Sequence, residues 1–213
     1  MAGDRVCGDR LGRRHPIPRS SHRGLIGAGR IAGPRLAAVS ELTIRDAVAA
    51  DAEAVAEIYA PYTLETAITF EDRPCPPAEM TQRIAAAQQR HAFLVAERDG
   101  AILGYAYAGV YRGRYAWQWC TEVSVYLRQG VRRTGAGRAL YQALLERLTE
   151  RGYVVAIASI TLPNDASLGL HRAFGFTDIG VTEMAGWKFG RWHDVLFCQL
   201  RLVEGYAEPA ALR

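Results

Sequence analysis

The sequence predicts an α/β (α+β) domain in which a mixed central β-sheet carries helices on both faces. Three observations predict this fold. Segments typical of strands alternate along the chain with segments of helical period. Residues 137–151 place apolar side chains at 140, 141, 144, 145 and 148, the 3.6-residue period of a helix with one packed face. Residues 154–160 are nearly all apolar, as in a central strand that is covered on both faces.

The first part of the predicted domain holds one strand and two helices. We expect a short strand at 43–46, and a helix that follows Asp51 and is interrupted at Pro61-Tyr62. A proline-rich loop then leads to a second helix at about 78–89.

A hairpin and a further strand are expected next. Residues 93–97 and 102–108 flank Asp99-Gly100, a dipeptide that favours a two-residue turn between antiparallel strands. The next strand is predicted at 117–127.

The last part of the domain follows from the remaining periodic segments. The helix at 137–151 ends before Gly152, a residue that commonly stops a helix. After the strand at 154–160 we expect a helix at about 165–174 and two final strands, at about 177–187 and 194–202.

The turn between residues 127 and 137 predicts an anion-binding site. The first N–H groups of a helix have no intrahelical partners, and the helix dipole adds positive charge there, so a phosphate can bind. Gly135 and Gly137 allow the main chain to approach such a ligand, and Arg132, Arg133 and Arg138 add charge. A solvated basic turn is the alternative.

This turn carries a family resemblance. Arg132-x-x-Gly135-x-Gly137 is similar to the Q/R-x-x-G-x-G/A signature of the GCN5-related N-acetyltransferases (GNAT), which bind the pyrophosphate of acetyl-CoA there. From about residue 43 to 202 the chain resembles the subgroup that includes phosphinothricin and methionine sulfoximine acetyltransferases. Four further segments carry the likeness: 58–62, 119–126, 162–171 and 186–195, of which the last is the most specific.

The resemblance implies an acetyl-CoA site. In the family the strand before the turn splays, and its main chain pairs with the pantetheine arm. Asn164 resembles an asparagine that contacts acetyl-CoA, although a helix cap is an alternative role. The implied cofactor-binding residues are Val125, Tyr126, Leu127, Arg132, Arg133, Thr134, Gly135, Ala136, Gly137, Arg138 and Asn164.

The resemblance also implies three candidate catalytic residues. Glu122 resembles the general base, since a carboxylate in a partly desolvated cleft can accept a proton at the working pH; an exposed strand carboxylate or an ion-pair partner is the alternative. His171 occupies the position where many relatives carry a tyrosine that protonates the departing thiolate, and its alternative is a structural hydrogen bond. Tyr141 is a second candidate near the cofactor, although its helical spacing also suits packing.

The acceptor pocket is expected to involve four residues. Arg114 matches a subgroup arginine whose planar guanidinium suits a carboxylate or phosphinate. Phe70, Arg73 and Trp117 fall where the subgroup shapes its pocket. Herbicide-detoxifying members often have Tyr at the position of Trp117, so the sequence does not rank the acceptors.

Charge and cysteine content exclude several classes. The 213 residues carry a net charge of +4, but residues 1–40 contain eight Arg and two Asp, or +6, which leaves 4 − 6 = −2 for the remainder. The body is therefore not basic, and we expect no nucleic-acid partner. The four cysteines lack the spacing of a metal knuckle, and His193 and Asp194 are too few ligands for a metal site. The sequence contains no run of about 18 apolar residues, so we expect no membrane span.

The domain boundaries follow from composition. Residues 1–40 lack periodicity and predict a disordered basic extension; an alternative is that translation begins at Val39. Arg13-Arg14 is not followed by an uninterrupted apolar segment, so we expect no export and a cytoplasmic location. Residues 41–204 form the predicted acetyltransferase domain, and 205–213 a C-terminal tail.

The function implied is transfer of acetyl from acetyl-CoA to the α-amino group of a small amino acid or analogue, by direct attack in a ternary complex. Phosphinothricin and methionine sulfoximine or sulfone are the type of acceptor. Acetylation of a protein N-terminus or another amine, a non-catalytic acetyl-CoA-binding regulator, and a nucleic-acid binder acting through the tail are the alternatives. The subgroup implies a homodimer.

Overall fold

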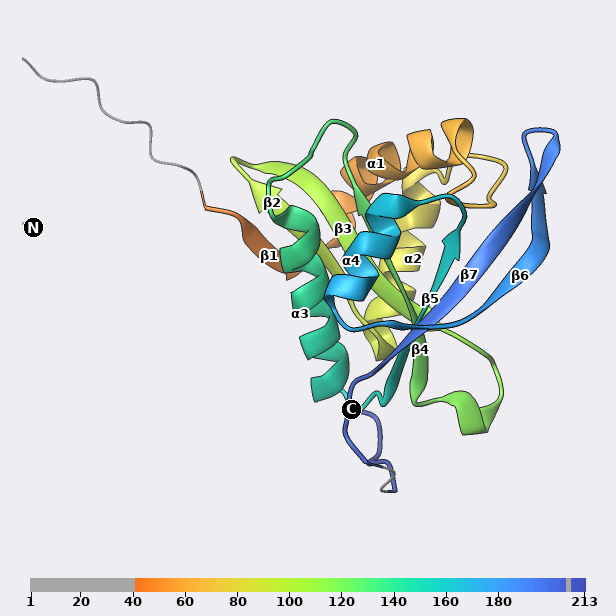
Figure 1. The fold of residues 1–213 in the computed structure, drawn as a ribbon. Helices are drawn as coiled ribbons and strands as arrows, with labels where there is room; N and C mark the ends of the chain where they lie inside the picture. The colour runs from red at the N-terminus through yellow and green to blue at the C-terminus, as the bar shows by residue number, and fades with distance from the viewer. Residues whose placement is uncertain (1–40, 206–207) are drawn as a thin grey trace, which may run out of the picture. The chain divides into compact units, whose positions relative to one another are not determined.

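The computed structural model describes residues 41–205 and 208–213; the predicted extension at 1–40 lies outside them. Four α-helices are described: α1 (Ala52–Glu65), α2 (Pro77–Arg90), α3 (Ala136–Glu150) and α4 (Asp165–Ala173). The strands are β1 (Thr43–Asp46), β2 (Phe93–Arg98), β3 (Ala101–Val110), β4 (Cys120–Leu127), β5 (Val155–Thr161), β6 (Thr177–Lys188) and β7 (Arg191–Arg201). They form one mixed sheet in the order β1-β2-β3-β4-β5-β7-β6 (Figure 1). The predicted fold class is confirmed.

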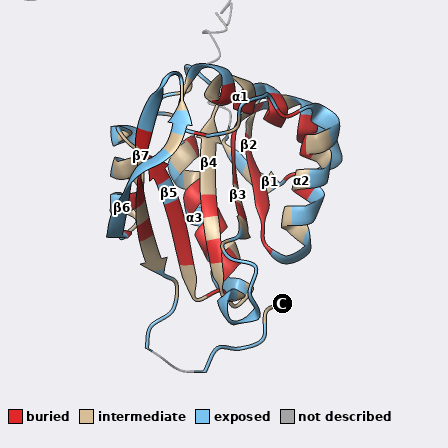
Figure 2. Ribbon diagram, turned by 90° about the vertical axis from the view of Figure 1, so that its right-hand side faces the viewer, coloured by how far each residue is buried: buried red, intermediate tan, exposed pale blue. Residues whose placement is uncertain are grey.

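Helices cover both faces of this sheet. α1 and α2 pack on one face, and α3 and α4 pack on the other (Figure 1). The predicted period of α3 is confirmed, because Leu140, Tyr141, Leu144 and Leu148 are fully buried against the sheet. Each such side chain contributes on the order of 1.5–3 kcal/mol by leaving water. The buried residues concentrate in the central strands (Figure 2).

The β2–β3 hairpin forms as predicted. Asp99 and Gly100 adopt φ values of 53° and 73°, the left-handed pair that a two-residue turn of this kind requires. The strand pairing is antiparallel, with Phe93 opposite Tyr107.

Two predicted boundaries are wrong. α1 does not stop at Pro61-Tyr62 but continues through Pro61 to Glu65. The proline removes one N–H, and the carbonyl that loses it belongs to Glu57 on the exposed side of the helix, while buried Tyr59 and Thr63 hold the turns on either side. The flanking packing therefore outweighs the lost hydrogen bond.

The other error concerns Trp117, which is not part of a strand. It ends a short 3₁₀ turn, Tyr115–Trp117, in which the Trp117 N–H donates to the Arg114 carbonyl at 2.9 Å. The chain enters β4 only at Cys120. An exposed tryptophan in a long connection thus gave the appearance of a strand residue.

Strands β4 and β5 run parallel and stay paired only at their beginnings. Cys120, Thr121 and Glu122 pair with Val155, Ala156 and Ile157. Beyond this point β4 remains paired with β3 on one side only, and β5 pairs with β7 along its length. The sheet is therefore open between β4 and β5 past Glu122.

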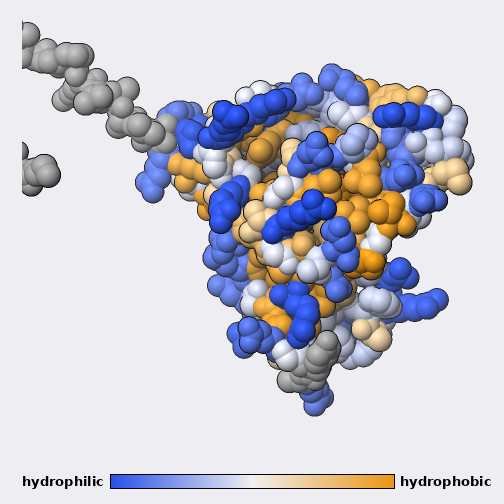
Figure 3. All heavy atoms as spheres, viewed as in Figure 1, coloured by the Kyte–Doolittle hydropathy of each residue, from blue (hydrophilic) through white to orange (hydrophobic). Residues whose placement is uncertain are grey.

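The edge hairpin β6–β7 carries unusual exposure for apolar residues. Nearly all of β6 is exposed (Figure 2), and Figure 3 shows hydrophobic residues gathered on the face that carries α3 and α4, from α4 toward β6 and β7. The exposed apolar side chains of the hairpin are Ile179, Val181, Met184, Trp187, Phe189 and Trp192.

Among the described residues, no helix has the length and apolar character needed to cross a membrane.

The C-terminal tail returns to the domain. Trp119 Nε1–H donates to the Ala210 carbonyl at 2.8 Å, and the Arg213 N–H donates to the Arg151 carbonyl at 3.1 Å. These contacts place residues 210–213 beside the beginning of β4 and the end of α3.

Candidate active site

A groove of about 740 Å³ occupies the opening between β4 and β5. One wall is the β4 segment 123–127, and the opposite wall is β5 together with the beginning of α4. The turn at 128–133 closes one end, and Tyr62 and Ile68 from the α1 side complete the lining. The groove therefore runs from the predicted anion turn to Val123, the residue after Glu122 in β4; Glu122 itself is not among the lining residues.

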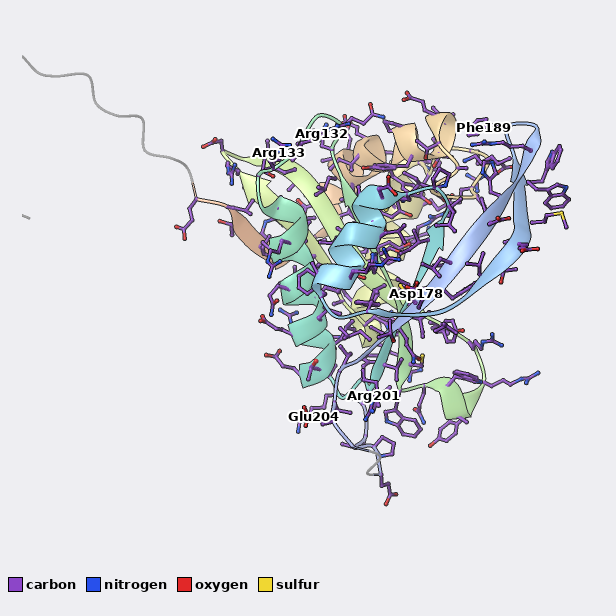
Figure 4. The ribbon with its side chains drawn as sticks, viewed as in Figure 1. Arg132, Arg133, Asp178, Phe189, Arg201 and Glu204 are labelled. Atoms are coloured by element: carbon purple, nitrogen blue, oxygen red, sulfur yellow. The ribbon has the colours of Figure 1, made fainter. Side chains whose placement is uncertain are left out.

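The anion end of the groove is the turn that begins α3. Gly135 precedes the helix with φ +80°, a left-handed conformation that favours glycine. Arg132 and Arg133 lie on this turn and line the groove (Figure 4). The first N–H groups of α3 have no intrahelical acceptors. Backbone donors and two guanidinium groups thus meet at one end of the opening.

The other residues of the turn are placed differently. Gly137 lines the groove and also lies against Leu127, since a Cβ at Gly137 would stand 3.3 Å from Leu127 Cδ1. Thr134 Oγ1 accepts a long hydrogen bond of 3.4 Å from the N–H of Ala136, which is fully buried. The Arg138 guanidinium lies 5.4 Å from the ring centroid of Phe174, the residue that follows α4, and is outside the groove lining.

The β4 main chain faces the groove at alternate residues. The Leu127 carbonyl accepts a hydrogen bond of 2.7 Å from the Tyr62 hydroxyl, and the ring of Tyr62 stands edge-on to Tyr126 at 5.0 Å. Backbone groups two residues apart in a strand point the same way, so those of Val125 also face the opening. The strand therefore presents backbone donors and acceptors without a partner strand.

Glu122 lies where β4 and β5 separate. It pairs with Ile157, and its carboxylate accepts a hydrogen bond of 2.5 Å from the Ser159 hydroxyl, two residues further along β5. Ser159 lines the groove, as does Ser124, which follows Glu122 on the same side of β4. The carboxylate is half-buried and oriented by a partner on the opposite wall.

Sequence reasoning missed Ser159 and Tyr107. Tyr107 lies opposite Ser124 on β3; burial raises the pKa of Tyr107, and the negative charge of Glu122 adds to the rise while a hydrogen bond with Ser124 opposes it. Ser159 is the only polar residue in the apolar segment 154–160, which is a signal that the sequence offered.

His171 and Tyr141 meet in the interior. The Tyr141 hydroxyl lies 2.7 Å from His171 Nε2, and His171 Nδ1 lies 2.7 Å from the Ser167 carbonyl. A carbonyl can only accept, so Nδ1 carries the proton and Nε2 accepts from the tyrosine. Burial lowers the pKa of His171 and raises the pKa of Tyr141 well above its usual range. The histidine is therefore neutral, and its single N–H is directed at the main chain.

Asn164 begins α4 at the edge of the groove. Its Oδ1 accepts a hydrogen bond of 3.1 Å from the Ser167 N–H, so Asn164 caps the helix while it lines the groove. Both roles considered for this residue are therefore compatible with its position.

The structure does not bring the four expected acceptor residues together. Phe70 and Arg73 belong to the α1–α2 connection, where Arg73 is exposed and pairs with Glu79 at 3.2 Å. Arg114 and Trp117 are exposed in the β3–β4 connection, at the end of the sheet opposite the Arg132–Arg133 turn (Figure 1). None of the four lines the groove. Phe70 instead packs on the β6–β7 hairpin, where a Cβ at Gly186 would overlap its ring.

No cluster of three or more His, Cys, Asp or Glu side chains in residues 41–205 and 208–213 is placed to hold a metal ion.

A sheet that opens between two parallel strands, with a glycine turn at one end of the opening and a carboxylate near the other, is the arrangement that the resemblance to acetyltransferases predicts. Residues 44–197 match the model of the acetyltransferase (GNAT) domain. The chain belongs to the GNAT family and is an acetyltransferase.

Known relatives extend the likeness over most of the chain. The phosphinothricin N-acetyltransferase of Streptomyces viridochromogenes is 40% identical over 170 residues, covering 80% of this chain and 92% of the relative. The L-methionine sulfoximine/L-methionine sulfone acetyltransferase of Salmonella typhimurium is 36% identical, covering 80% and 99%. The crystal structure of a phosphinothricin acetyltransferase from Sinorhizobium meliloti in complex with acetyl-CoA superposes with a TM-score of 0.76 at 39% identity, covering 79% and 93%.

Proposed function

We propose that this enzyme transfers the acetyl group of acetyl-CoA to the α-amino group of a small amino acid or amino-acid analogue of the phosphinothricin or methionine sulfoximine type. One observation carries the proposal: β4 separates from β5 directly after Glu122. A single strand thus supplies a carboxylate for the amine, and then an open backbone edge that leads to the anion turn.

The residues of the groove fit acetyl-CoA as the donor. The pyrophosphate would lie at the start of α3, beside Arg132 and Arg133, where backbone N–H groups and positive charge converge. The pantetheine arm carries amides, which match the open main-chain groups around Val125. Asn164 and Ser167 stand on the opposite wall.

Acetyl-CoA supplies an activated acetyl group as a thioester, and the residues of this chain manage the protons. Glu122 takes one proton from the acceptor ammonium, which frees the nitrogen lone pair for attack on the carbonyl carbon. The Ser159 hydroxyl holds the carboxylate in place. A main-chain N–H of β4 that faces the opening can polarise the carbonyl oxygen. As the new C–N bond forms, the C–S bond breaks, and the second proton that the nitrogen loses passes to the thiolate, which leaves as the free thiol.

For His171 and Tyr141 the geometry supports a positioning role. The one N–H of His171 is directed at the Ser167 carbonyl, and the Tyr141 hydroxyl is directed at His171. Neither proton faces the groove, although the ring of His171 forms part of its wall. The pair joins α3 to α4 and so holds Asn164 and Ser167 beside the donor. Proton donation would require both hydrogen bonds to rearrange.

A direct transfer in a ternary complex fits the state of Cys120. This residue lies at the start of β4, two residues before Glu122, and burial raises the pKa of its thiol to about 11. A protonated thiol is a poor nucleophile, so an acetyl-cysteine intermediate is not favoured.

The acceptor class rests on the relatives named above, which act on phosphinothricin and on methionine sulfoximine or sulfone. A protein N-terminus or another amine is the alternative acceptor, and a non-catalytic acetyl-CoA-binding regulator is the alternative class. The position of Glu122 at the strand opening favours catalysis. Mass spectrometry of the product tests the proposal: acetyl on the α-nitrogen of a small amino acid supports it, and acetyl-CoA binding without any product contradicts it.

We also propose that two copies of the chain associate through the β6–β7 hairpin. β6 is an edge strand, and Met184, Trp187 and Trp192 are among the apolar side chains that the hairpin exposes. Exposed apolar patches of this kind mark interaction surfaces. A light-scattering mass of two chains supports the dimer, and a mass of one chain contradicts it.

Residues 1–40 are not required in this proposal, since every residue that lines the groove or is given a role in the reaction lies within residues 62–171. Deletion of residues 1–40 should leave acetylation unchanged. Loss of activity on deletion would instead give the basic extension a functional part.

A further inference from the structure

Lys188 makes a connection that the acetyltransferase reaction described above does not use. It is the last residue of β6, and its ammonium donates three hydrogen bonds, to the main-chain carbonyls of Thr63, Thr69 and Glu71, at 2.7, 2.8 and 2.9 Å. An ammonium has three N–H donors, so all of them are used. The partners lie 117–125 residues away in the chain.

The three carbonyls belong to one structural unit. Thr63 is in the last turn of α1, where helix carbonyls lack intrahelical donors, and Thr69 and Glu71 belong to the α1–α2 connection. Thr63 is buried, so water cannot readily replace the ammonium at its carbonyl. A cation at the C-terminus of a helix is also favoured by the helix dipole. One side chain of the hairpin thus holds the end of α1 and the connection that follows it.

The same connection reaches the groove. Ile68, next to Thr69, is one of the residues that line the groove, as are Ser124 of β4 and Ser159 of β5. The Thr69 hydroxyl lies 2.7 Å from the Tyr59 hydroxyl, and Tyr59 stands edge-on to Tyr126 of β4 at 5.1 Å. The position of the connection is therefore coupled to β4, which forms one wall of the groove.

One further contact joins the hairpin to the connection, and another supports Lys188 within the hairpin. The Phe70 ring lies so close to Gly186 that no side chain fits there. His193, which is buried, hydrogen-bonds through Nε2 to the Lys188 carbonyl at 3.0 Å. On the other side of the connection, Arg83 of α2 binds the Glu71 carboxylate at 2.7 Å. The connection is thus held between α2 and the hairpin.

We propose that Lys188 is a positioning residue for acceptor recognition: its three hydrogen bonds hold residues 66–72 so that this connection forms the acceptor side of the groove. Lys188 does not line the groove itself; the connection that it holds contributes Ile68 to the lining, whereas Arg132 and Arg133 lie on the turn between β4 and α3. The hairpin thereby becomes part of the acceptor site without lining it. Only the expected change in the KM for the acceptor rests on the proposed function.

The test compares Lys188→Met with Arg191→Met in the full-length enzyme. Arg191 is an exposed cation of the same hairpin, opposite Lys188 in the strand register. Lys188→Met should raise the KM for the acceptor amine by about tenfold or more, while the KM for acetyl-CoA stays within about twofold. Arg191→Met should change neither KM. Lys188→Gln, which keeps two N–H donors, provides an intermediate variant if the methionine variant does not fold.

Amide hydrogen exchange gives an independent readout. In Lys188→Met the amides of residues 66–72 should exchange faster, while those of α3 stay protected. An unchanged acceptor KM, an equal rise in Arg191→Met, or unchanged exchange at 66–72 would overturn the inference. If the wild-type enzyme acetylates no small amine, the proposed function fails, and the exchange measurement alone still decides the role of Lys188.

Discussion

The Ser159 hydroxyl donates a hydrogen bond of 2.5 Å to the Glu122 carboxylate across the point where β4 and β5 separate. The two residues come from the strands on either side of the opening and meet only in the folded chain. The bond fixes one carboxylate oxygen and leaves the other able to accept a proton from an amine. This arrangement gives the candidate base a defined orientation.

Replacing Glu122 with Gln should abolish most turnover and leave donor binding intact. The amide cannot accept the ammonium proton, so kcat should fall by about 10²–10⁴. The Kd for acetyl-CoA should stay within about twofold, because the donor is held by the turn and the β4 edge. Steady-state kinetics and calorimetric titration check both expectations. Wild-type turnover in the variant would remove Glu122 as the base.

The Ser159→Ala variant should have a smaller effect than Glu122→Gln. The carboxylate keeps its charge but loses its orientation, so kcat should fall by about tenfold or less. The same assay measures it. A loss as large as that of Glu122→Gln would mean that the serine takes a direct part in the chemistry.

Substitutions of the His171–Tyr141 pair should affect stability more than rate. His171→Phe leaves the buried Tyr141 hydroxyl without its acceptor, which costs about 1–3 kcal/mol of unfolding free energy. Urea denaturation measures the loss, and kcat should change by less than about tenfold. Tyr141→Phe is the matched variant, because it removes the hydroxyl of the same Tyr141–His171 hydrogen bond. A large fall in kcat with unchanged stability in both would assign the pair to proton transfer.

Gly186→Ala should disturb the acceptor side of the groove. The added Cβ would overlap the Phe70 ring, so the ring and the α1–α2 connection must shift. We expect a higher KM for the acceptor, an unchanged KM for acetyl-CoA, and a loss of about 1–3 kcal/mol in stability. The control is Gly180→Ala in the same strand, where an added Cβ meets open space. Equal behaviour of the two variants would contradict the close packing of Phe70.

The pH dependence of stability should report on His91. This residue is buried, with Nδ1 lying 2.8 Å from the Tyr153 hydroxyl and 3.2 Å from the Thr121 hydroxyl. Burial, with Arg90 and Arg151 nearby, lowers the pKa of His91 to about 4. Between pH 6.5 and 4 the unfolded chain binds a proton that the folded chain does not, so stability falls as the pH falls.

The loss attributable to His91 should reach about 2 kcal/mol by pH 4.5. Urea denaturation of the wild type and of His91→Gln at several pH values between 7 and 4.5 measures it. The variant should lose less stability over this range, whatever its stability at pH 7. If the free energy of unfolding falls equally with pH in the wild type and in His91→Gln, His91 does not titrate as described.

Local patterns predicted much of the fold. The period of α3 and the Asp99-Gly100 turn depend on neighbours within a few residues, and both form as expected. Pro61 was misread because the packing that keeps α1 continuous comes from other parts of the chain.

The site was predictable only in part, for the same reason. The Arg132–Gly137 turn is a local motif, and the chain's membership of the family follows from it and the other segments. The orientation of Glu122 depends on Ser159, which is 37 residues away, and the three carbonyls bound by Lys188 are farther still. Whether His171 holds its proton on Nδ1 depends on the Ser167 carbonyl and on Tyr141, which the helical pattern does not reveal.

The most direct test of the account is release of free thiol from acetyl-CoA by the full-length enzyme across a panel of amines. The panel should contain phosphinothricin, methionine sulfoximine, methionine sulfone, ordinary amino acids and peptides with free N-termini, and Glu122→Gln should be measured in parallel. The account predicts thiol release with at least one small amino acid or analogue, and its loss in Glu122→Gln. Silence across every amine, or release that persists in Glu122→Gln, would contradict it.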